Sequence, residues 1–169
     1  MTFDARPRAQ IAAVHADTPA EHLFFAQFRY WMAGYSLRDI SCWDSAWDSL
    51  LRFVAEDAAK TLYSEFHLFT RALKSQSERP IRWRPDVCRC LLRDEYLALC
   101  LVSASQRNER AREFSAAAEL LATDQVHVLL MASRSLAQAL LVRRFLLAPG
   151  NHASEWGTEP RASHTRQLH

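Results

Sequence analysis

Arginines gather around one tryptophan in the middle of the chain, where they could bind an anion. Residues 79–85 have the sequence RPIRWRP, and two further arginines follow on the next segment. Guanidinium groups bind phosphate or carboxylate oxygens through paired hydrogen bonds, and an aromatic ring beside them can stack on a base. We therefore predict an anion-binding corner that is formed by Arg79, Arg82, Arg84, Arg89 and Arg93.

The charge of the chain is polarised, although its net charge is only +2. Residues 79–112 contain eight arginines and four acidic residues, whereas residues 36–66 contain three basic and six acidic residues. Two interpretations stay open: the arginines pair with acidic helices beside them, or they contact a partner. The small net charge does not favour nucleic acid as that partner.

The spacing of the cysteines and histidines gives only weak evidence for a metal site. Cys88, Cys90 and Cys100 are close in the sequence, but zinc sites usually space paired cysteines by two to four residues. On a helix, the side chains of Cys88 and Cys90 would point about 200° apart. His67 and His127 belong to no His-x-x-x-His or Glu-x-x-His pair on a helix. We predict no metal site and no cofactor, and whether these cysteines ever bind metal stays open.

No catalytic residue is predicted. Between Tyr35 and Pro149 the chain has no glycine, which excludes phosphate loops, dinucleotide fingerprints and nucleophile elbows from that stretch. Asp44 and Asp48 could bind a cation or transfer protons, because they are four residues apart. Their position opposite two tryptophans is more typical of the solvated side of a helix.

Aromatic residues cover more than one stripe of the first predicted helix. Phe25 and Tyr30 lie off its main apolar line, with Arg29 beside them. Either this helix is buried on two sides, or one side docks another protein or a second copy of the chain. Aromatic residues and arginine dominate interaction hot spots. The predicted partner-binding residues are Phe25, Arg29, Tyr30, Arg82, Trp83 and Arg84.

The helices can be placed from caps and apolar periodicity. Thr18 and Glu21 form a capping box that begins the first helix, and Gly34 is predicted to end it. One apolar stripe covers residues 39–75, as one long helix or as two with a break near residues 56–57.

The second half of the chain is predicted to be helical as well. A helix from about Pro85 to Gln106 is apolar on most faces, which predicts a position in the middle of the fold. Asn108 and Thr123 are predicted to cap two later helices.

These elements predict an all-α fold, a single-domain bundle of five or six mostly antiparallel helices over residues 18–147. Residues 1–17 are predicted to be a flexible arm and residues 148–169 a disordered tail. The chain of 169 residues, with 49% apolar and 24% charged residues, has the composition of one globular domain. It has no apolar run of about 20 residues, so no membrane span is predicted, and its four cysteines form no disulfide framework. A cytoplasmic location follows as an expectation.

These patterns favour a non-enzymatic accessory or regulatory protein that acts by protein–protein interaction. A homo-oligomer, in which the chain binds a second copy of itself, is one form that this interaction can take. The first alternative is a nucleic-acid-binding or transcription-related module that uses the basic region 79–112. The second is a helical bundle that binds a metal or a small ligand through its cysteines and histidines.

Overall fold

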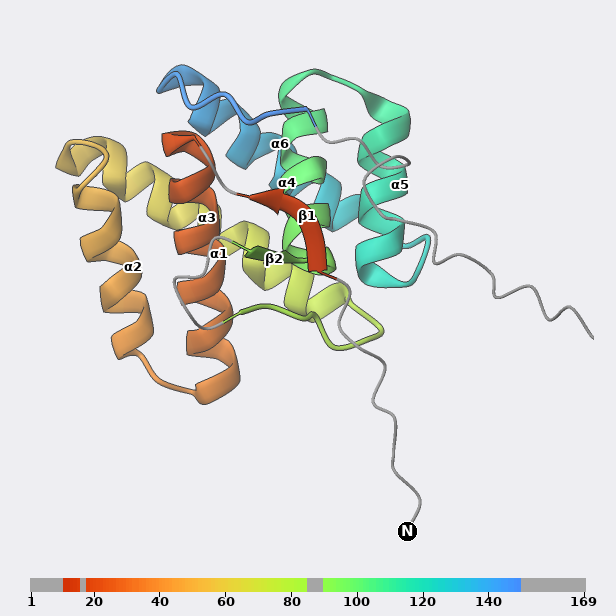
Figure 1. Cartoon of the computed structure of the whole chain (residues 1–169), viewed down its shortest axis with the longest axis horizontal. Coiled ribbons are helices and arrows are strands. Elements are labelled where there is room, and N and C mark those ends of the chain that lie inside the picture. Colours follow the sequence, from red (N-terminus) through yellow and green to blue (C-terminus); the bar gives the residue numbers. More distant parts are fainter. Residues whose placement is uncertain (1–10, 16–17, 85–89, 150–169) are drawn as a thin grey trace, which may run out of the picture.

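The structure is a computed structural model that describes residues 11–15, 18–84 and 90–149. Within these ranges six helices pack against one another, and one two-stranded sheet lies beside them (Figure 1). The elements are β1 (Ile11–His15), α1 (Pro19–Leu37), α2 (Ser41–Leu51), α3 (Glu56–Gln76), β2 (Cys90–Leu92), α4 (Arg93–Gln106), α5 (Arg110–Leu121) and α6 (His127–Val142). The predicted all-α bundle is confirmed. None of these helices is both long and apolar enough to cross a lipid bilayer.

Helix α1 begins as the sequence predicts. The Thr18 hydroxyl accepts a hydrogen bond from the Glu21 N–H, and the Glu21 carboxylate accepts one from the Thr18 N–H, both at 3.2 Å. This capping box satisfies two amides that the first turn would otherwise leave unpaired. The helix does not end at Gly34, however. It continues to Leu37, and Arg38 ends it in the left-handed conformation, with φ 54°.

Gly34 allows α2 to approach α1 closely. A Cβ atom at this position would lie 2.1 Å from Nε1 of Trp43, a distance at which real atoms overlap. The two helices run antiparallel and side by side, joined by a short turn (Figure 1). Glycine is therefore required here for packing and not for its backbone conformation.

The apolar stripe over residues 39–75 is divided between two helices, which decides between the two predicted alternatives. Helix α2 ends at Leu51 and α3 begins at Glu56. Ala55 is the N-cap of α3, and its side chain makes no capping hydrogen bond. Instead, Glu56 and Asp57 lie in the first turn, where the helix dipole favours negative charge.

Helix α4 lies at the centre of the bundle, as its all-round apolar sequence predicts. Residues 94–106 are all buried, and α4 packs against α1, α5, α6 and the sheet. Its start is a correction to the prediction: the helix begins at Arg93 and not near Pro85. Residues 85–89 lie outside the described ranges, and Cys90–Leu92 form β2.

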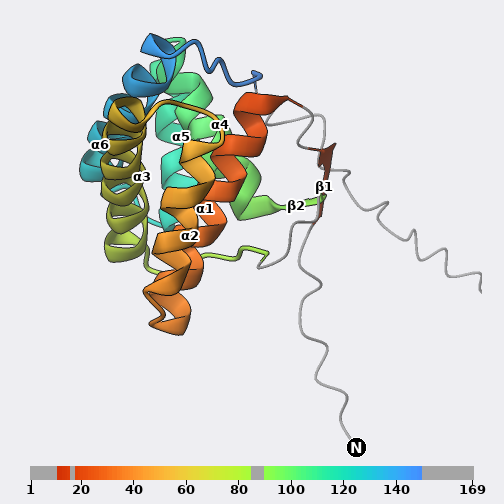
Figure 2. The ribbon, with the colours of Figure 1, turned by 90° about the vertical axis from the view of Figure 1, so that its left-hand side faces the viewer.

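The small sheet joins two segments that are distant in the sequence. β1 is antiparallel to β2, with Ile11 opposite Leu92 and Ala12 opposite Leu91. In Figure 2 this ribbon lies on the side of the molecule opposite to α3 and α6. The prediction of a flexible arm is therefore wrong for residues 11–15, because they are paired with β2. The rest of that arm, residues 1–10 and 16–17, lies outside the described residues.

After α6 the chain returns to the C-terminal end of α4. The side chain of Gln106 donates to the carbonyl of Phe145 at 2.8 Å and accepts from the N–H of Leu147 at 2.9 Å. The Ser103 hydroxyl donates to the carbonyl of Ala148 at 2.8 Å. The predicted tail thus begins with a residue that is bound to α4, and residues 150–169 lie outside the described part of the chain.

Aromatic rings fill the junction of α1, α2 and α3. Trp31 stacks on His67 with ring centroids 4.8 Å apart and an interplanar angle of 12°. It also contacts Tyr63 at 4.8 Å and Trp43 at 5.6 Å. Burial in this cluster, together with the nearby positive charge of Arg71, lowers the pKa of His67 below its usual value of 6.5.

The lowered pKa of His67 predicts that stability falls in mild acid. The folded protein binds this proton less readily than the unfolded chain, so the unfolded chain takes up more protons as the pH falls below about 6.5. The stability that the neutral His67 contributes is fully present above that pH and is lost as the pH falls through the pKa of His67 in the folded state. Urea denaturation at about pH 7.5 and about pH 5.5 measures the effect. In His67→Gln the difference between these two pH values will be smaller; an unchanged difference would assign it to other groups.

Candidate functional site

The segment that leaves α3 forms the predicted corner. We call residues 79–84 the arginine corner; they follow α3 and precede the residues that lead to β2. Two adjacent carboxylates, Asp94 and Glu95 in the first turn of α4, hold this segment in place. The corner is therefore positioned by the central helix of the bundle.

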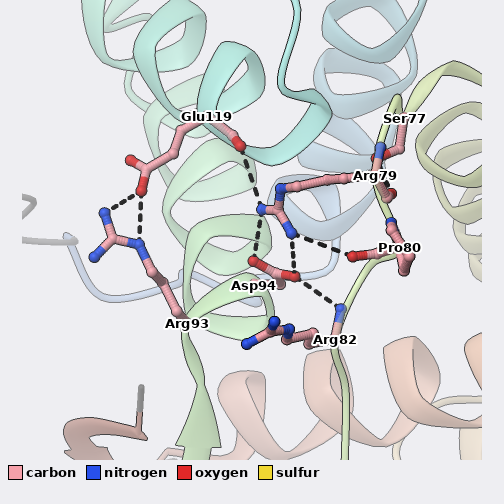
Figure 3. Close-up of polar contacts among 7 residues, drawn as sticks. All are labelled: Ser77, Arg79, Pro80, Arg82, Arg93, Asp94 and Glu119. Atoms are coloured by element: carbon pink, nitrogen blue, oxygen red, sulfur yellow. Dashed lines mark hydrogen bonds and ion pairs between the residues drawn. The ribbon is translucent and has the colours of Figure 1, made fainter. Parts of the chain in front are cut away.

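Asp94 binds both a side chain and the backbone of the corner. Arg79 donates two hydrogen bonds to it, each 2.8 Å long, and the backbone N–H of Arg82 donates a third at 2.7 Å (Figure 3). Arg79 also donates to the carbonyl of Glu119 at 3.3 Å. The hydrogen bond to Asp94 raises the pKa of the Arg79 guanidinium above its ordinary value. Such a bidentate pair fixes both groups, so Arg79 is engaged within the fold.

Glu95 is fully buried and accepts hydrogen bonds from three segments. The Nε atom of Arg29 on α1 donates to it at 2.6 Å, and the backbone N–H of Leu92 donates at 2.8 Å. The backbone N–H of Arg84 donates at 3.2 Å. One carboxylate thus joins α1, α4 and the arginine corner.

A third ion pair lies beside the first two. Both Nε and Nη2 of Arg93 donate to Glu119 on α5, the first at 2.6 Å (Figure 3). Of the five predicted anion-binding arginines, Arg79 and Arg93 are therefore paired with acids. Arg89 lies outside the described residues.

The side chains of Arg82 and Arg84 form no ion pair within the described part of the chain. Arg82 is exposed and Arg84 is half-buried. In Figure 3 the backbone N–H of Arg82 reaches Asp94, whereas its guanidinium joins none of the contacts. Between them Trp83 is half-buried and packs against the core, as Ile81 does. The corner thus presents two cations on a backbone that is fixed by carboxylates.

The aromatic side of α1 is not a surface. Phe25 and Arg29 are 3% and 8% exposed, and Tyr30 is half-buried against the core. Helix α1 packs against α2, α3 and α4, so it is buried on two sides. The prediction that Phe25 and Arg29 are surface contacts is therefore corrected, and Arg29 instead neutralises Glu95.

The structure gives little support for cation binding at Asp44 and Asp48 or for metal binding by cysteines and histidines. Asp44 and Asp48 are exposed on α2. The side chains that the structure describes bring no three histidines, cysteines or acids together as a metal site. Cys42 on α2 is a free thiol and Cys100 is buried in α4, whereas Cys88 and the side chain of Cys90 lie outside the described set.

A second buried carboxylate was not found from the sequence. Burial alone would raise the pKa of Glu113 on α5, but hydrogen bonds from Arg134, Ser105 and Arg110 lower it below its ordinary value. Arg134 on α6 donates to it at 2.7 Å and Arg110 at 3.1 Å. Ser105 also hydrogen-bonds to Ser133, at 2.8 Å. This network joins α4, α5 and α6 inside the bundle; the three-residue spacing of Arg110 and Glu113 was the only local signal for it.

Comparison of the chain with family models, with curated proteins and with solved structures found no match.

Proposed function

We propose that this chain is a non-enzymatic, cytoplasmic accessory or regulatory protein that works by binding another protein through the arginine corner. The observation that carries the proposal is that the backbones and the side chains of Arg82 and Arg84 differ in their contacts. Their backbone amides are bound by Asp94 and Glu95, while their guanidinium groups pair with no described acid.

A corner that is ordered before binding loses little conformational freedom when a partner arrives. Fixing a flexible loop at an interface costs about 0.5–1.5 kcal/mol for each long side chain that is immobilised, in addition to the backbone. Here the backbone of the corner is already fixed by Asp94 and Glu95 in the free protein, so partner binding loses little backbone entropy. Between the two cations, the half-buried Trp83 packs against the core and so helps to fix the segment that carries them. Carboxylates on the partner are the matching groups, because they accept paired hydrogen bonds from guanidinium.

The same contacts reduce the support for a nucleic-acid interface. The surplus of arginines in residues 79–112 is largely engaged by carboxylates or by backbone carbonyls. Arg79, Arg93, Arg110 and Arg112 pair with acids, and Arg107 binds the carbonyls of Ser103 and Leu147. A phosphate backbone requires a row of available cations. Two neighbouring cations better match a short acidic segment of a protein.

Removal of the two available cations is the test. We expect Arg82→Ala/Arg84→Ala to capture at least about tenfold less of a specific partner from a native extract than the wild type does, because charge-assisted bonds contribute about 1.5–3 kcal/mol each. Captured proteins are quantified by mass spectrometry. The variant keeps both backbone amides, so its fold should be intact, and circular dichroism checks this.

The matched control is Arg52→Ala/Arg71→Ala. It removes the same charge from exposed positions at the end of α2 and on α3. It should capture the partner as the wild type does. Equal loss in both variants would indicate a general charge effect, and equal capture by the corner variant and the wild type would refute the proposal.

A further inference from the structure

The backbone of residues 81–84 has an inner edge that is already paired. The N–H groups of Arg82 and Arg84 donate to Asp94 at 2.7 Å and to Glu95 at 3.2 Å. In extended chain, the amides of alternate residues point to the same side. Because both amides bind carboxylates of the same helical turn, we infer that residues 81–84 run extended, with this side facing α4.

Within the part of the chain that the structure describes, the opposite edge is unpaired. The intervening amides of Ile81 and Trp83 must point away from Asp94 and Glu95. Their backbone N–H and C=O groups make no hydrogen bond to any residue in the described ranges. A row of unpaired backbone groups is a template on which an extended peptide can add as a strand.

The side chains of the segment alternate in the same way. Ile81 and Trp83 pack against the core, so Arg82 and Arg84 lie on the other face. Their Cα atoms are separated by about 7 Å in extended chain, which is also the spacing of every second residue on a paired strand. Acidic residues at alternate positions of an added strand would each lie beside one arginine.

We infer that the partner contributes a short extended segment with acidic residues at alternate positions, which adds as a β-strand along the outer edge of residues 81–84. The segment pairs with the backbone of Ile81 and Trp83 and places its carboxylates against Arg82 and Arg84. This inference rests on the proposed function and specifies its binding mode. Pro80 and Pro85 flank the edge and lack an N–H donor, so the added strand is short.

Hydrogen exchange at single amides provides the test. The full-length ¹⁵N-labelled chain is mixed with a synthetic peptide of about ten residues in which glutamate alternates with threonine. Exchange at the amides of Ile81 and Trp83 should slow by about three- to tenfold, as one net hydrogen bond predicts. The amides of Arg82 and Arg84, already bound in the free protein, should change less.

Two matched peptides separate backbone pairing from charge. One has the same composition with its glutamates in a single block, and the other carries N-methyl groups on alternate backbone amides. Both should bind more weakly and should leave Ile81 and Trp83 unprotected. Arg82→Ala/Arg84→Ala should lose most of its binding to the alternating peptide.

The outcomes for the two proposals can be told apart. Equal binding of the alternating and the N-methylated peptides, or binding without protection of Ile81 and Trp83, overturns strand addition and leaves the proposed function standing. Failure of the alternating peptide to bind also overturns strand addition. If the capture experiment shows no dependence on Arg82 and Arg84, the proposed function fails whatever the peptide does.

Discussion

Replacing Glu95 by glutamine will lower the free energy of unfolding by about 3–5 kcal/mol. The carboxylate is fully buried, and the side chain of its partner Arg29 is only 10% exposed. In the variant the guanidinium stays in the interior without a counter-charge. In addition, the amide of glutamine cannot accept every hydrogen bond that the carboxylate accepts from Arg29, Leu92 and Arg84. Urea denaturation followed by circular dichroism measures the change.

Glu119→Gln is the control for this prediction. The Glu119 side chain is 36% exposed and pairs with a similarly exposed Arg93, so its loss should cost less than about 1 kcal/mol. Removal of both buried charges in Arg29→Met/Glu95→Met should restore part of the stability, because no unpaired ion remains. If Glu95→Gln is no more destabilising than Glu119→Gln, the buried pair does not stabilise the fold in the way described.

Gly34→Ala will lower the free energy of unfolding by about 1–3 kcal/mol, although alanine is favoured over glycine within a helix by about 1 kcal/mol. The new methyl group would lie 2.1 Å from Nε1 of Trp43 and 2.6 Å from Cδ1 of the same ring. That ring is rigid and is packed against Trp31 and Tyr35, each at 5.6 Å between centroids. The ring and α2 must therefore move away from α1. Thermal and urea unfolding will record the loss.

A double-mutant cycle isolates this clash. In the background of Trp43→Leu the ring is absent, and Gly34→Ala should then be neutral or stabilising because only the helix preference of alanine remains. The same penalty in both backgrounds would show that Trp43 is not what excludes a side chain at position 34.

Local signals predicted some elements correctly and others wrongly: Glu109 and Val126, and not Asn108 and Thr123, are the N-caps of α5 and α6. The capping box of Thr18 and Glu21 depends on residues three positions apart, and the central place of α4 follows from apolar residues on all its faces. The sheet could not be predicted in this way, since β1 pairs with a segment in the other half of the chain. A run of three residues such as Cys90–Leu92 shows no period that separates strand from helix.

The sequence singled out residues 79–85 as a candidate site, but it could not say which of their arginines are paired within the fold. The composition of residues 79–85 pointed to the corner. Which arginines are available depends on acids that are remote in the chain: Arg29 and Glu95 are 66 positions apart. Phe25 lies off the main apolar line of α1, but periodicity alone cannot say that α4 covers a second side of that helix.

The two carboxylates at the start of α4 also make the corner and the core one thermodynamic unit. The first turn of α4 supplies both acids, so the corner has its bound form only while that turn and the contact of Glu95 with α1 are intact. A ligand that recognises this form and not the unfolded chain stabilises the whole bundle by mass action, by about 2.7 kcal/mol when its free concentration is about 100 times Kd. Occupancy of a four-residue edge is thereby linked to the folding equilibrium of all six helices described.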